Sequence, residues 1–284
     1  MSEARLRAID CSSVDGQTLT LLRQAAVRHC SGYDQFTIGV YLDWRTQEVG
    51  VAAARSGDQA LIDAYSSGDV YHALADMCGL TNDPDRQHWK NTQPVMRQRM
   101  KGLQLGINYG MGVPSLAKGL DRHPLIASEI IEKHRRTYPR FWQWREDMVQ
   151  RAMLDRQMET VFGWPLYLSS RPNRRTLYNF PMQGDGAEML RLAAWLLYEA
   201  GIIPSMLVHD GILLELQNEE RITHAMEIMH IAGREVCNGL EIGVDVDQLL
   251  RNGGRYRDKR GKKMWATMMQ TLQEIGAIPP GELP

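Results

Sequence analysis

Two cations and two amides recur along residues 97–110, which read RQRMKGLQLGINYG. Arg97 and Lys101 are four residues apart, so on an α-helix they lie one above the other, and Gln104 and Asn108 continue the same stripe. A stripe of this composition suits an anionic ligand with flat sides, such as a nucleoside triphosphate. The alternative is a solvated basic helix face, and this segment alone does not distinguish the two.

A carboxylate stands at the end of a predicted buried strand. Residues 36–42 are rich in β-branched and aromatic side chains, as buried strands are, and Asp43 follows directly. A carboxylate at this place is costly unless it binds a cation or is otherwise paired. Asp43 is therefore either a candidate metal ligand or the cap of the helix that the apolar run after Glu48 indicates.

A second carboxylate lies in a predicted hairpin. The apolar runs 206–208 and 212–216 flank His209-Asp210-Gly211, a spacing typical of two strands joined by a short turn. Asp210 would project from this turn. Asp-Gly is also common in hairpins that carry no chemistry, so an ordinary turn residue is the alternative.

Together, the three segments predict a phosphoryl-transfer site. Mg²⁺ prefers a few protein carboxylates together with phosphate oxygens and water. Two such ions, held by Asp43 and Asp210, can clamp the attacking and leaving oxygens of an in-line displacement. The basic helix would neutralise the triphosphate. We therefore expect two Mg²⁺ ions as cofactors, with Mn²⁺ as an alternative ion.

Four motifs, in this order along the chain, resemble those of family A DNA polymerases, the DNA polymerase I type. DWRTQE at 43–48 resembles the family's first motif, D-Y-S-Q-I-E, and NFPMQG at 179–184 matches N-x-P-M-Q-G. His209-Asp210 matches the third motif, V-H-D-E. The second motif, R-x-x-x-K-x-x-x-[FY]-x-x-x-Y-G, is matched at Arg97, Lys101, Tyr109 and Gly110. The resemblance covers about residues 36–250.

The resemblance implies catalytic roles for five residues. Asp43 and Asp210 would be the metal ligands, with the backbone carbonyl of Trp44 as a third. Arg97 and Lys101 would contact the incoming deoxynucleoside triphosphate. Lys101 would also donate a proton to the leaving pyrophosphate.

It also implies a nucleotide pocket with two departures from the family. Tyr109 would lie near the templating base and the nucleotide sugar, and Glu48 beside it would block a ribose 2′-hydroxyl. Leu105 stands where the family has Phe or Tyr, and Tyr71 where many members have a phosphate-binding His. His72 is adjacent, but one residue along a helix turns a side chain by about 100°.

Primer-template contacts are implied for a second set. Arg175, Asn179 and Gln183 recur every four residues and would share a helical face. The resemblance implies that they reach the minor groove, where the acceptors of all correct base pairs look alike. His209 would also face the primer-template. The alternative for the helical trio is ordinary solvent-exposed polarity.

Gly211 stands where the third motif has Glu, so one acidic group is missing, and Glu48 or Asp245 could partly replace it. The retained residues favour an active enzyme, a template-directed DNA polymerase that adds deoxynucleotides to a primer 3′ end. The alternative is a catalytically weakened nucleic-acid-binding subunit of a split polymerase or of a replication or repair complex. A two-metal phosphohydrolase ranks last, because the further ligands it needs are missing.

Residues 1–35 predict one or two short helices. The resemblance implies a thumb at this place in the family, and often an exonuclease domain. Three explanations are open: a separate chain that supplies these parts, a natural minimal polymerase, or a truncated product. The expected partners are primer-template DNA, deoxynucleoside triphosphates and, under the first explanation, that separate chain.

Composition agrees with a compact enzyme, since 43% of the 284 residues are hydrophobic and 24% are charged. The four cysteines show no paired spacing, which argues against a zinc site or disulfides. No apolar stretch reaches the roughly 18 residues of a membrane span, so we expect no membrane partner and a cytoplasmic place in a bacterial or phage-type context. The basic run 251–263 is either a solvated linker or a template-phosphate contact.

We expect an α+β fold, with an antiparallel palm sheet backed by helices and a mainly helical fingers subdomain. The sheet would combine residues 36–43, the hairpin around Asp210 and residues 241–246. A long helix at 183–200 and a small hairpin of 159–162 with 165–168 would accompany it. The predicted boundaries are a short helical segment at 1–35, the palm at 36–57 and 157–250, the fingers at 58–156, and a basic linker with a C-terminal helix at 251–284.

Overall fold

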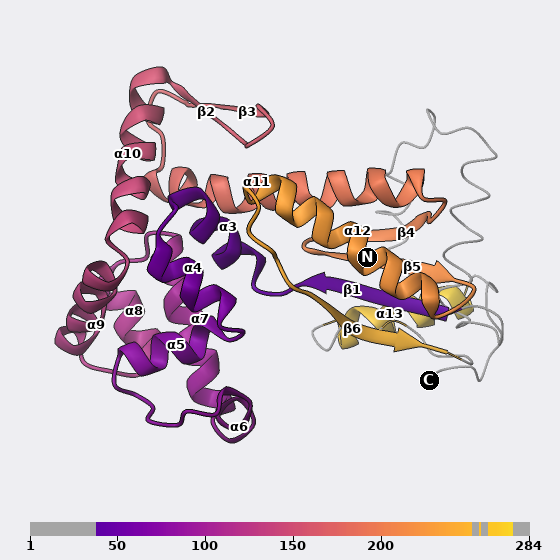
Figure 1. Ribbon diagram of the computed structural model, residues 1–284, viewed down its shortest axis with the longest axis horizontal. Helices are drawn as coiled ribbons and strands as arrows, with labels where there is room; N and C mark the ends of the chain where they lie inside the picture. Colours follow the sequence, from indigo (N-terminus) through magenta and orange to yellow (C-terminus); the bar gives the residue numbers. More distant parts are fainter. Residues whose placement is uncertain (1–37, 252–255, 257–260, 275–284) are drawn as a thin grey trace. The chain divides into compact units, whose positions relative to one another are not determined.

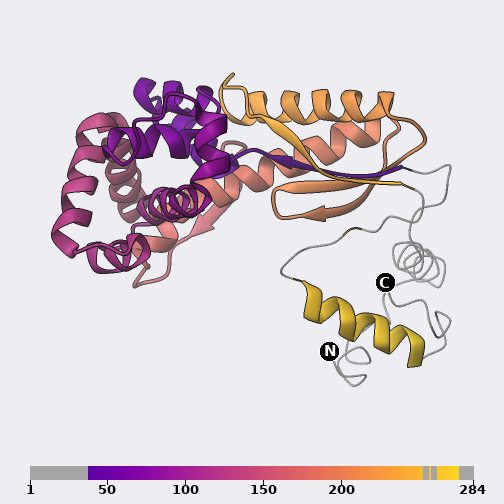
Figure 2. The ribbon, with the colours of Figure 1, turned by 90° about the horizontal axis from the view of Figure 1, so that it is seen from below.

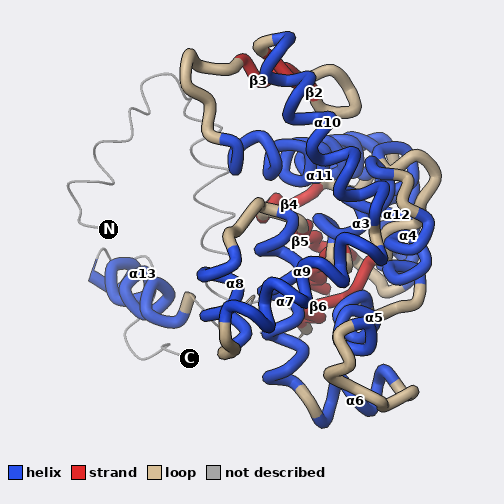
Figure 3. The backbone as a smooth tube through the Cα atoms, turned by 90° about the vertical axis from the view of Figure 1, so that its left-hand side faces the viewer, coloured by secondary structure: helices blue, strands red, loops and turns tan. Residues whose placement is uncertain are grey.

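The computed structural model describes residues 38–251, 256 and 261–274. The chain divides into two compact units. The first holds the described residues up to 43, residues 197–226 and those from 245 onward; the second holds residues 44–196 and 227–244. Helices far outnumber strands (Figure 3), and one antiparallel sheet dominates the strands, so the predicted α+β class is confirmed.

The main sheet has the strand order β4-β5-β1-β6. These strands are β1 (Ile38–Trp44), β4 (Pro204–Val208), β5 (Gly211–Leu216) and β6 (Val244–Leu250). Strand β5 runs antiparallel to both of its neighbours, β1 and β4. Figure 1 shows the sheet with its labels, and Figure 2 shows the β4–β5 hairpin from below.

The last strand begins three residues later than the predicted 241–246. The backbone before it bonds elsewhere: the carbonyl of Gly243 accepts from the Arg45 amide at 2.7 Å, and the carbonyl of Ile242 bonds to the His230 ring at 3.0 Å. These carbonyls therefore do not enter the ladder, and the strand starts at Val244.

Helices follow one another in the second unit through the stretch predicted to be helical, 58–156 (Figure 1). They are α4 (Gln59–Ser66), α5 (Val70–Met77), α6 (Arg86–Thr92), α7 (Pro94–Asn108), α8 (Val113–Leu120), α9 (Pro124–Thr137) and α10 (Pro139–Asp155), and α3 (Gln47–Ser56) precedes them. The carboxylates of Asp58, Asp69 and Asp85 accept backbone N–H groups at the starts of α4, α5 and α6. Proline opens α7, α9 and α10, where its missing N–H has no intrahelical partner to lose.

The next helix, α11 (Arg174–Glu199), begins nine residues before the predicted 183. Pro181 lies inside it, and the expectation that the helix would start after this proline was wrong. The small hairpin is also shifted: β2 (Gln157–Glu159) pairs with β3 (Pro165–Tyr167) around a longer loop. Within that loop the Thr160 amide donates to the Trp164 carbonyl at 3.0 Å, which closes the turn without a ladder.

Two helices complete the described chain, α12 (Glu220–Val236) and α13 (Lys262–Glu274), and the second confirms the predicted C-terminal helix. The predicted helical segment 1–35 and most of the basic run 251–263 lie outside the described residues. Among the helices described, none combines the length and apolarity needed to cross a membrane.

Each unit has its own buried cluster. In the second unit Val149 and Ala152 of α10 pack with Met158, Leu177 and Tyr178, which join α10 to the small hairpin and to α11. In the first unit the cluster forms on the sheet itself, around Tyr41, Leu213 and Leu250.

Candidate functional site

Strand pairing brings Asp43 and Asp210 to one end of the sheet. Asp43 lies directly opposite Gly211 in the β1–β5 register, and Asp210 is the residue before Gly211. Val208 also pairs with Gly211, so the turn has two residues, His209 and Asp210, rather than the predicted three. Asp43, in β1, and Asp210, in the turn before β5, therefore lie at the same end of the sheet and in one unit.

The alternative role of Asp43 as a helix cap is not what the structure shows. The N-cap of α3 is Thr46, in a left-handed conformation with φ of 48°. It lies three positions after Asp43, which belongs to β1. Asp43 therefore occupies a strand position.

Negative charge from both aspartates acts on one neighbouring group, the phenol of Tyr41. Burial is the largest cause that raises the pKa of Tyr41, followed by Tyr256 and then by the charges of Asp43 and Asp210. The Asp210 side chain is 35% exposed, and its Oδ1 lies 3.1 Å from Nδ1 of His209. A cation that reached this end of the sheet would meet two carboxylates, one of them open to solvent.

The donor set at this end fits a hard divalent cation. Its side-chain donors are carboxylate oxygens, those of Asp43 and Asp210; the carbonyl of Trp44 stays a prediction as a third ligand. Over the part of the chain that the structure describes, no group of three or more His, Cys, Asp or Glu residues could hold a metal. Mg²⁺, which keeps water and phosphate oxygens among its ligands, tolerates so small a protein set, whereas a structural zinc site does not.

In the second unit, the two cations of the α7 stripe differ in their surroundings. Arg97 donates from Nε to Oδ2 of Asp69 at 2.8 Å, and its guanidinium lies over the ring of Tyr71, 5.0 Å from the centroid. Tyr71 is buried, and burial is the main reason why its pKa is raised. Lys101 is exposed. A phosphate group approaching this face would meet Lys101 at the surface.

The amides predicted to extend that stripe do not face solvent. Gln104 and Asn108 are 1% and 0% exposed, and the Gln104 amide donates to Oδ1 of Asn108 at 3.0 Å. The Gln104 carbonyl oxygen lies 3.2 Å from Nε2 of His134, whose Nδ1 accepts from the Trp142 indole at 3.0 Å. The expectation that these amides hold an anionic ligand was wrong, because both are buried and Gln104 bonds to Asn108 on its own helix and to His134 of α9.

A buried arginine supports the C-terminal end of α7. Arg145 is 5% exposed and donates to the carbonyl of Ile107, in the last turn of the helix. Its guanidinium lies 4.1 Å from the ring centroid of Tyr178 and 4.5 Å from that of Trp142. A positive charge near a helix C-terminus stabilises the helix, so Arg145 stabilises the end of α7, next to Tyr109. Sequence reasoning did not single out this residue.

Tyr109, Glu48 and Gln183 form one polar cluster in the second unit. The Gln183 amide donates to Oε1 of Glu48 at 2.6 Å and to the Tyr109 hydroxyl at 3.2 Å. Burial first, then hydrogen bonding to Glu48 and its charge, raise the pKa of the Tyr109 phenol. The predicted proximity of Glu48 and Tyr109 is therefore seen, and a residue assigned to another role, Gln183, joins them.

The remaining predicted residues are dispersed. Leu105 is half-buried on α7. On α11, Arg175 is exposed, whereas Asn179 and Gln183 are half-buried. His72 is buried, bonds to the Asp83 carbonyl at 2.7 Å and packs edge-on against Trp89. It therefore has a structural role in the turn after α5.

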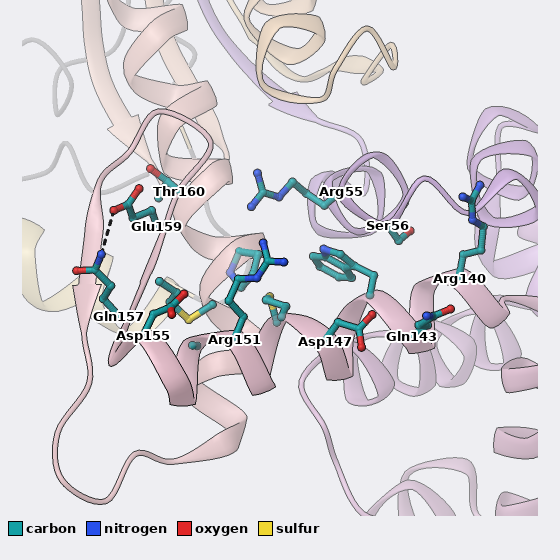
Figure 4. A pocket seen from close by; sticks show the side chains of 15 residues that line it. Arg55, Ser56, Arg140, Gln143, Asp147, Arg151, Asp155, Gln157, Glu159 and Thr160 are labelled. Atoms are coloured by element: carbon teal, nitrogen blue, oxygen red, sulfur yellow. Dashed lines mark hydrogen bonds between the residues drawn. The ribbon is translucent and has the colours of Figure 1, made fainter.

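A pocket of about 750 Å³ in the second unit contains none of the predicted residues (Figure 4). Side chains of α3, α10 and the β2 segment line it, among them three arginines and two aspartates: Arg55, Arg140, Arg151, Asp147 and Asp155. Figure 4 shows these residues around the opening, where Gln157 donates to Glu159. The lining comes from segments some hundred residues apart, so no local pattern in the sequence indicates it.

Comparison with known proteins agrees with this geometry. The family model described as DNA polymerase family A matches residues 9–253. The thermostable DNA polymerase I of Thermus thermophilus is 28% identical over 227 residues, which are 74% of this chain and 27% of that protein. The DNA polymerase of Mycobacterium phage D29 is 24% identical over 259 residues, 89% of this chain and 40% of that one.

Among solved structures, the polymerase domain of Pol1 from M. smegmatis, in complex with a DNA primer-template and a dNTP, has a TM-score of 0.64 at 21% identity. The match covers 79% of this chain and 41% of that one, and it shows a shared fold. This chain thus spans about a quarter to two-fifths of the relatives it matches. Because the family model covers most of the sequence, the chain belongs to DNA polymerase family A.

Proposed function

We propose that this chain is a template-directed DNA polymerase that adds deoxynucleotides to a primer 3′ end. The observation that carries the proposal is the β1–β5 register, which sets Asp43 opposite Gly211 and thus beside Asp210. Two carboxylates at adjacent strand ends are what a divalent-cation site for phosphoryl transfer needs. Family membership supports the same reaction.

Asp43 and Asp210, with the carbonyl of Trp44, would hold the cations. Two Mg²⁺ ions, or Mn²⁺ in their place, would supply charge stabilisation at the attacking and leaving oxygens when bound. The partial exposure of Asp210 leaves it accessible to a cation that arrives with a nucleotide. His209, 3.1 Å from Asp210 and 60% exposed, would contact the primer strand.

On α7, Arg97 and Lys101 would bind the triphosphate. Arg97 is oriented by Asp69 and Tyr71 and would act as a fixed charge. Lys101 is exposed and has a flexible stem, so it would follow the departing pyrophosphate and donate its proton.

The Glu48–Gln183–Tyr109 cluster would select the sugar. Glu48 is held by the Gln183 amide and by Tyr109, so its carboxylate cannot move aside cheaply. A ribose 2′-hydroxyl beside it would be excluded, and the substrate would be a deoxynucleotide. Leu105 and Tyr71 would complete this pocket, and Arg175 and Asn179, with Gln183, would contact the primer-template.

Primer extension tests the proposal. The purified chain is mixed with a labelled primer-template, Mg²⁺ or Mn²⁺ and four deoxynucleotides, beside the variants Asp43→Asn and Asp210→Asn. The matched control is Asp247→Asn, the same change at an exposed residue of β6 in the same sheet. We expect extension to fall by about a thousandfold or more in the first two variants, as it does when a group that stabilises transition-state charge is lost, with near-normal extension in the control.

DNA binding, measured by fluorescence anisotropy, separates chemistry from recognition. Asp43→Asn and Asp210→Asn should bind primer-template about as well as the unaltered chain. Unchanged extension in both variants would exclude the carboxylate pair as the catalytic centre. A folded chain that binds DNA and never extends a primer would favour the subunit role, and restoration of extension by a second polypeptide would identify the missing part.

A further inference from the structure

The end of the Tyr41 side chain occupies the space that a side chain at position 211 would fill. An ideal Cβ added to Gly211 would lie 2.3 Å from the hydroxyl oxygen of Tyr41 and 2.5 Å from its Cζ. Real Cβ atoms essentially never come within 3.0 Å of another heavy atom in this way. The φ of Gly211 is not in the left-handed region. The glycine is therefore required by its neighbours, the tyrosine ring first and the Leu42 carbonyl oxygen second, and not by its own backbone conformation.

The Tyr41 ring spans three strands. It starts on β1 opposite Leu213 of β5, crosses the bare backbone of Gly211, and donates from its hydroxyl to the carbonyl of Val208 on β4 at 3.2 Å. Val208 and Gly211 are the paired residues that close the His209–Asp210 turn. The hydroxyl is therefore bonded to the base of the turn that carries Asp210.

The turn has a reason to need such support. His209 has a φ of 55°, a left-handed conformation that costs a non-glycine residue about 1 kcal/mol. Among the described strands, β4 pairs with β5 alone, and its register shifts between Pro204 and Met206. The bond from Tyr41 ties this edge to the central strand β1, on which Asp43 lies.

The ring itself is anchored without its hydroxyl. Tyr41 is 6% exposed and packs with Leu213, Leu250 and Val208, and its centroid lies 4.9 Å from that of Tyr256. Removing only the hydroxyl should therefore leave the ring in place, which separates its hydrogen-bonding role from its packing role.

We propose that Tyr41 is a positioning residue for the metal site: its hydroxyl, in the space that a side chain at 211 would take, holds the Val208 carbonyl and so fixes Asp210 beside Asp43. In a family whose third motif has Glu after the aspartate, this chain replaces that side chain by one from the neighbouring strand. The inference rests on the proposed function, because it assumes that the two aspartates bind a divalent cation.

The test is Mn²⁺ binding to the DNA-free chain, followed by electron paramagnetic resonance, in the variant Tyr41→Phe. Its matched control is Tyr65→Phe, because Tyr65 is equally buried and donates to the backbone carbonyl of Arg45 at 2.8 Å. Each variant loses the bond to its carbonyl and the further hydrogen bonds of its hydroxyl, with Tyr256 for Tyr41 and with Gly243 and Thr46 for Tyr65, so both should lose some thermal stability. We expect Tyr41→Phe to weaken Mn²⁺ binding about fivefold, the value of one hydrogen bond, and Tyr65→Phe to leave it unchanged.

Mn²⁺ affinity that is the same in Tyr41→Phe as in the unaltered chain would overturn the positioning role while leaving the metal site intact. Mn²⁺ binding that does not depend on Asp210, tested with Asp210→Asn, would overturn the metal site and this role together. Since the readout does not require primer extension, a chain without polymerase activity still decides the inference.

A double-mutant cycle tests whether the Tyr41 side chain is what requires a glycine at position 211. Gly211→Ala is made in the unaltered chain and in Tyr41→Ala, and unfolding is followed thermally. The Cβ also lies 2.8 Å from the Leu42 carbonyl oxygen, but that contact is common to both backgrounds. We expect Gly211→Ala to lower the midpoint clearly more when Tyr41 is present; an equal loss in both backgrounds would show that Tyr41 is not what requires the glycine.

Discussion

Arg97 and Asp69 form a partly buried ion pair, with Nε of the arginine 2.8 Å from Oδ2 of the aspartate and side-chain exposures of 27% and 8%. Asp69 is also the N-cap of α5, where its other oxygen accepts from the amides of Tyr71 and His72. Arg97, which we expect to bind the triphosphate, is thus held in one orientation by Asp69, and Asp69 also caps the start of α5.

Replacing Arg97 by Gln should weaken nucleotide binding. We expect the KM for deoxynucleotides in primer extension to rise about tenfold, because a charge-assisted contact to phosphate is lost, with a smaller change in kcat. Arg99→Gln is the matched control, since Arg99 lies on the same helix and pairs with Asp121 at 3.1 Å. Equal effects of the two variants on KM would contradict the role of Arg97.

Glu48 should decide between ribose and deoxyribose. In Glu48→Ala the side chain beside Tyr109 is gone, and we expect ribonucleotide incorporation relative to deoxynucleotide incorporation to rise at least about tenfold. Glu48→Gln keeps the size of the side chain and should retain most of the discrimination. Single-nucleotide insertion with matched dNTP and rNTP pairs measures the ratio; a ratio unchanged in Glu48→Ala would exclude Glu48 as the barrier.

The hydrogen-bonded side chains of Trp142, His134 and Gln104 should make the free energy of unfolding depend on pH. Burial, and secondarily the charge of Arg145, lower the pKa of His134 from 6.5 to about 3. The neutral ring is therefore favoured in the folded state. The contribution of His134 to the free energy of unfolding is complete above pH about 6.5 and is lost as the pH falls toward 3. Between pH 7 and pH 5 the loss should be about 2 kcal/mol.

Urea unfolding at the two pH values measures this loss. His134→Asn is the control: its side-chain oxygen can accept from the Trp142 indole, but it does not titrate. The variant should be less stable at pH 7 and should lose about 2 kcal/mol less than the unaltered chain on going to pH 5. An identical pH dependence in both proteins would show that His134 is not the titrating group.

Gly110 should tolerate no side chain. Its φ is +69°, and an added Cβ would lie 2.5 Å from Cδ2 of Tyr178. Gly110→Ala should cost about 2 kcal/mol or more in unfolding free energy, from backbone strain and overpacking together. Gly102→Ala, inside helix α7 with open space around the new Cβ, should stabilise by about 0.5–1 kcal/mol. Similar changes in both variants would contradict this account.

Short-range patterns predicted much of the fold correctly. The helices between 58 and 156 and the hairpin that carries Asp210 are found where the sequence indicates them, because caps, prolines and alternating apolar residues act over only a few positions. The sheet predicted from residues 36–43 and the hairpin around Asp210 is also found, as the pairing of β1 with β5. Element ends were less certain: α11 runs through Pro181, and β6 begins late because Ile242 and Gly243 have partners outside the ladder.

What local spacing could not reveal was which partner each polar side chain would meet. Periodicity places Arg97, Lys101, Gln104 and Asn108 along one side of α7. The last two are buried, however, and the Gln104 carbonyl oxygen meets His134, thirty residues further along the chain. The same holds for Tyr41, whose reach to Val208 and exclusion of a side chain at 211 depend on a register between strands about 170 residues apart. Spacing along a chain determines which residues share a face, whereas burial and hydrogen bonding depend on the distant segments that folding brings against that face.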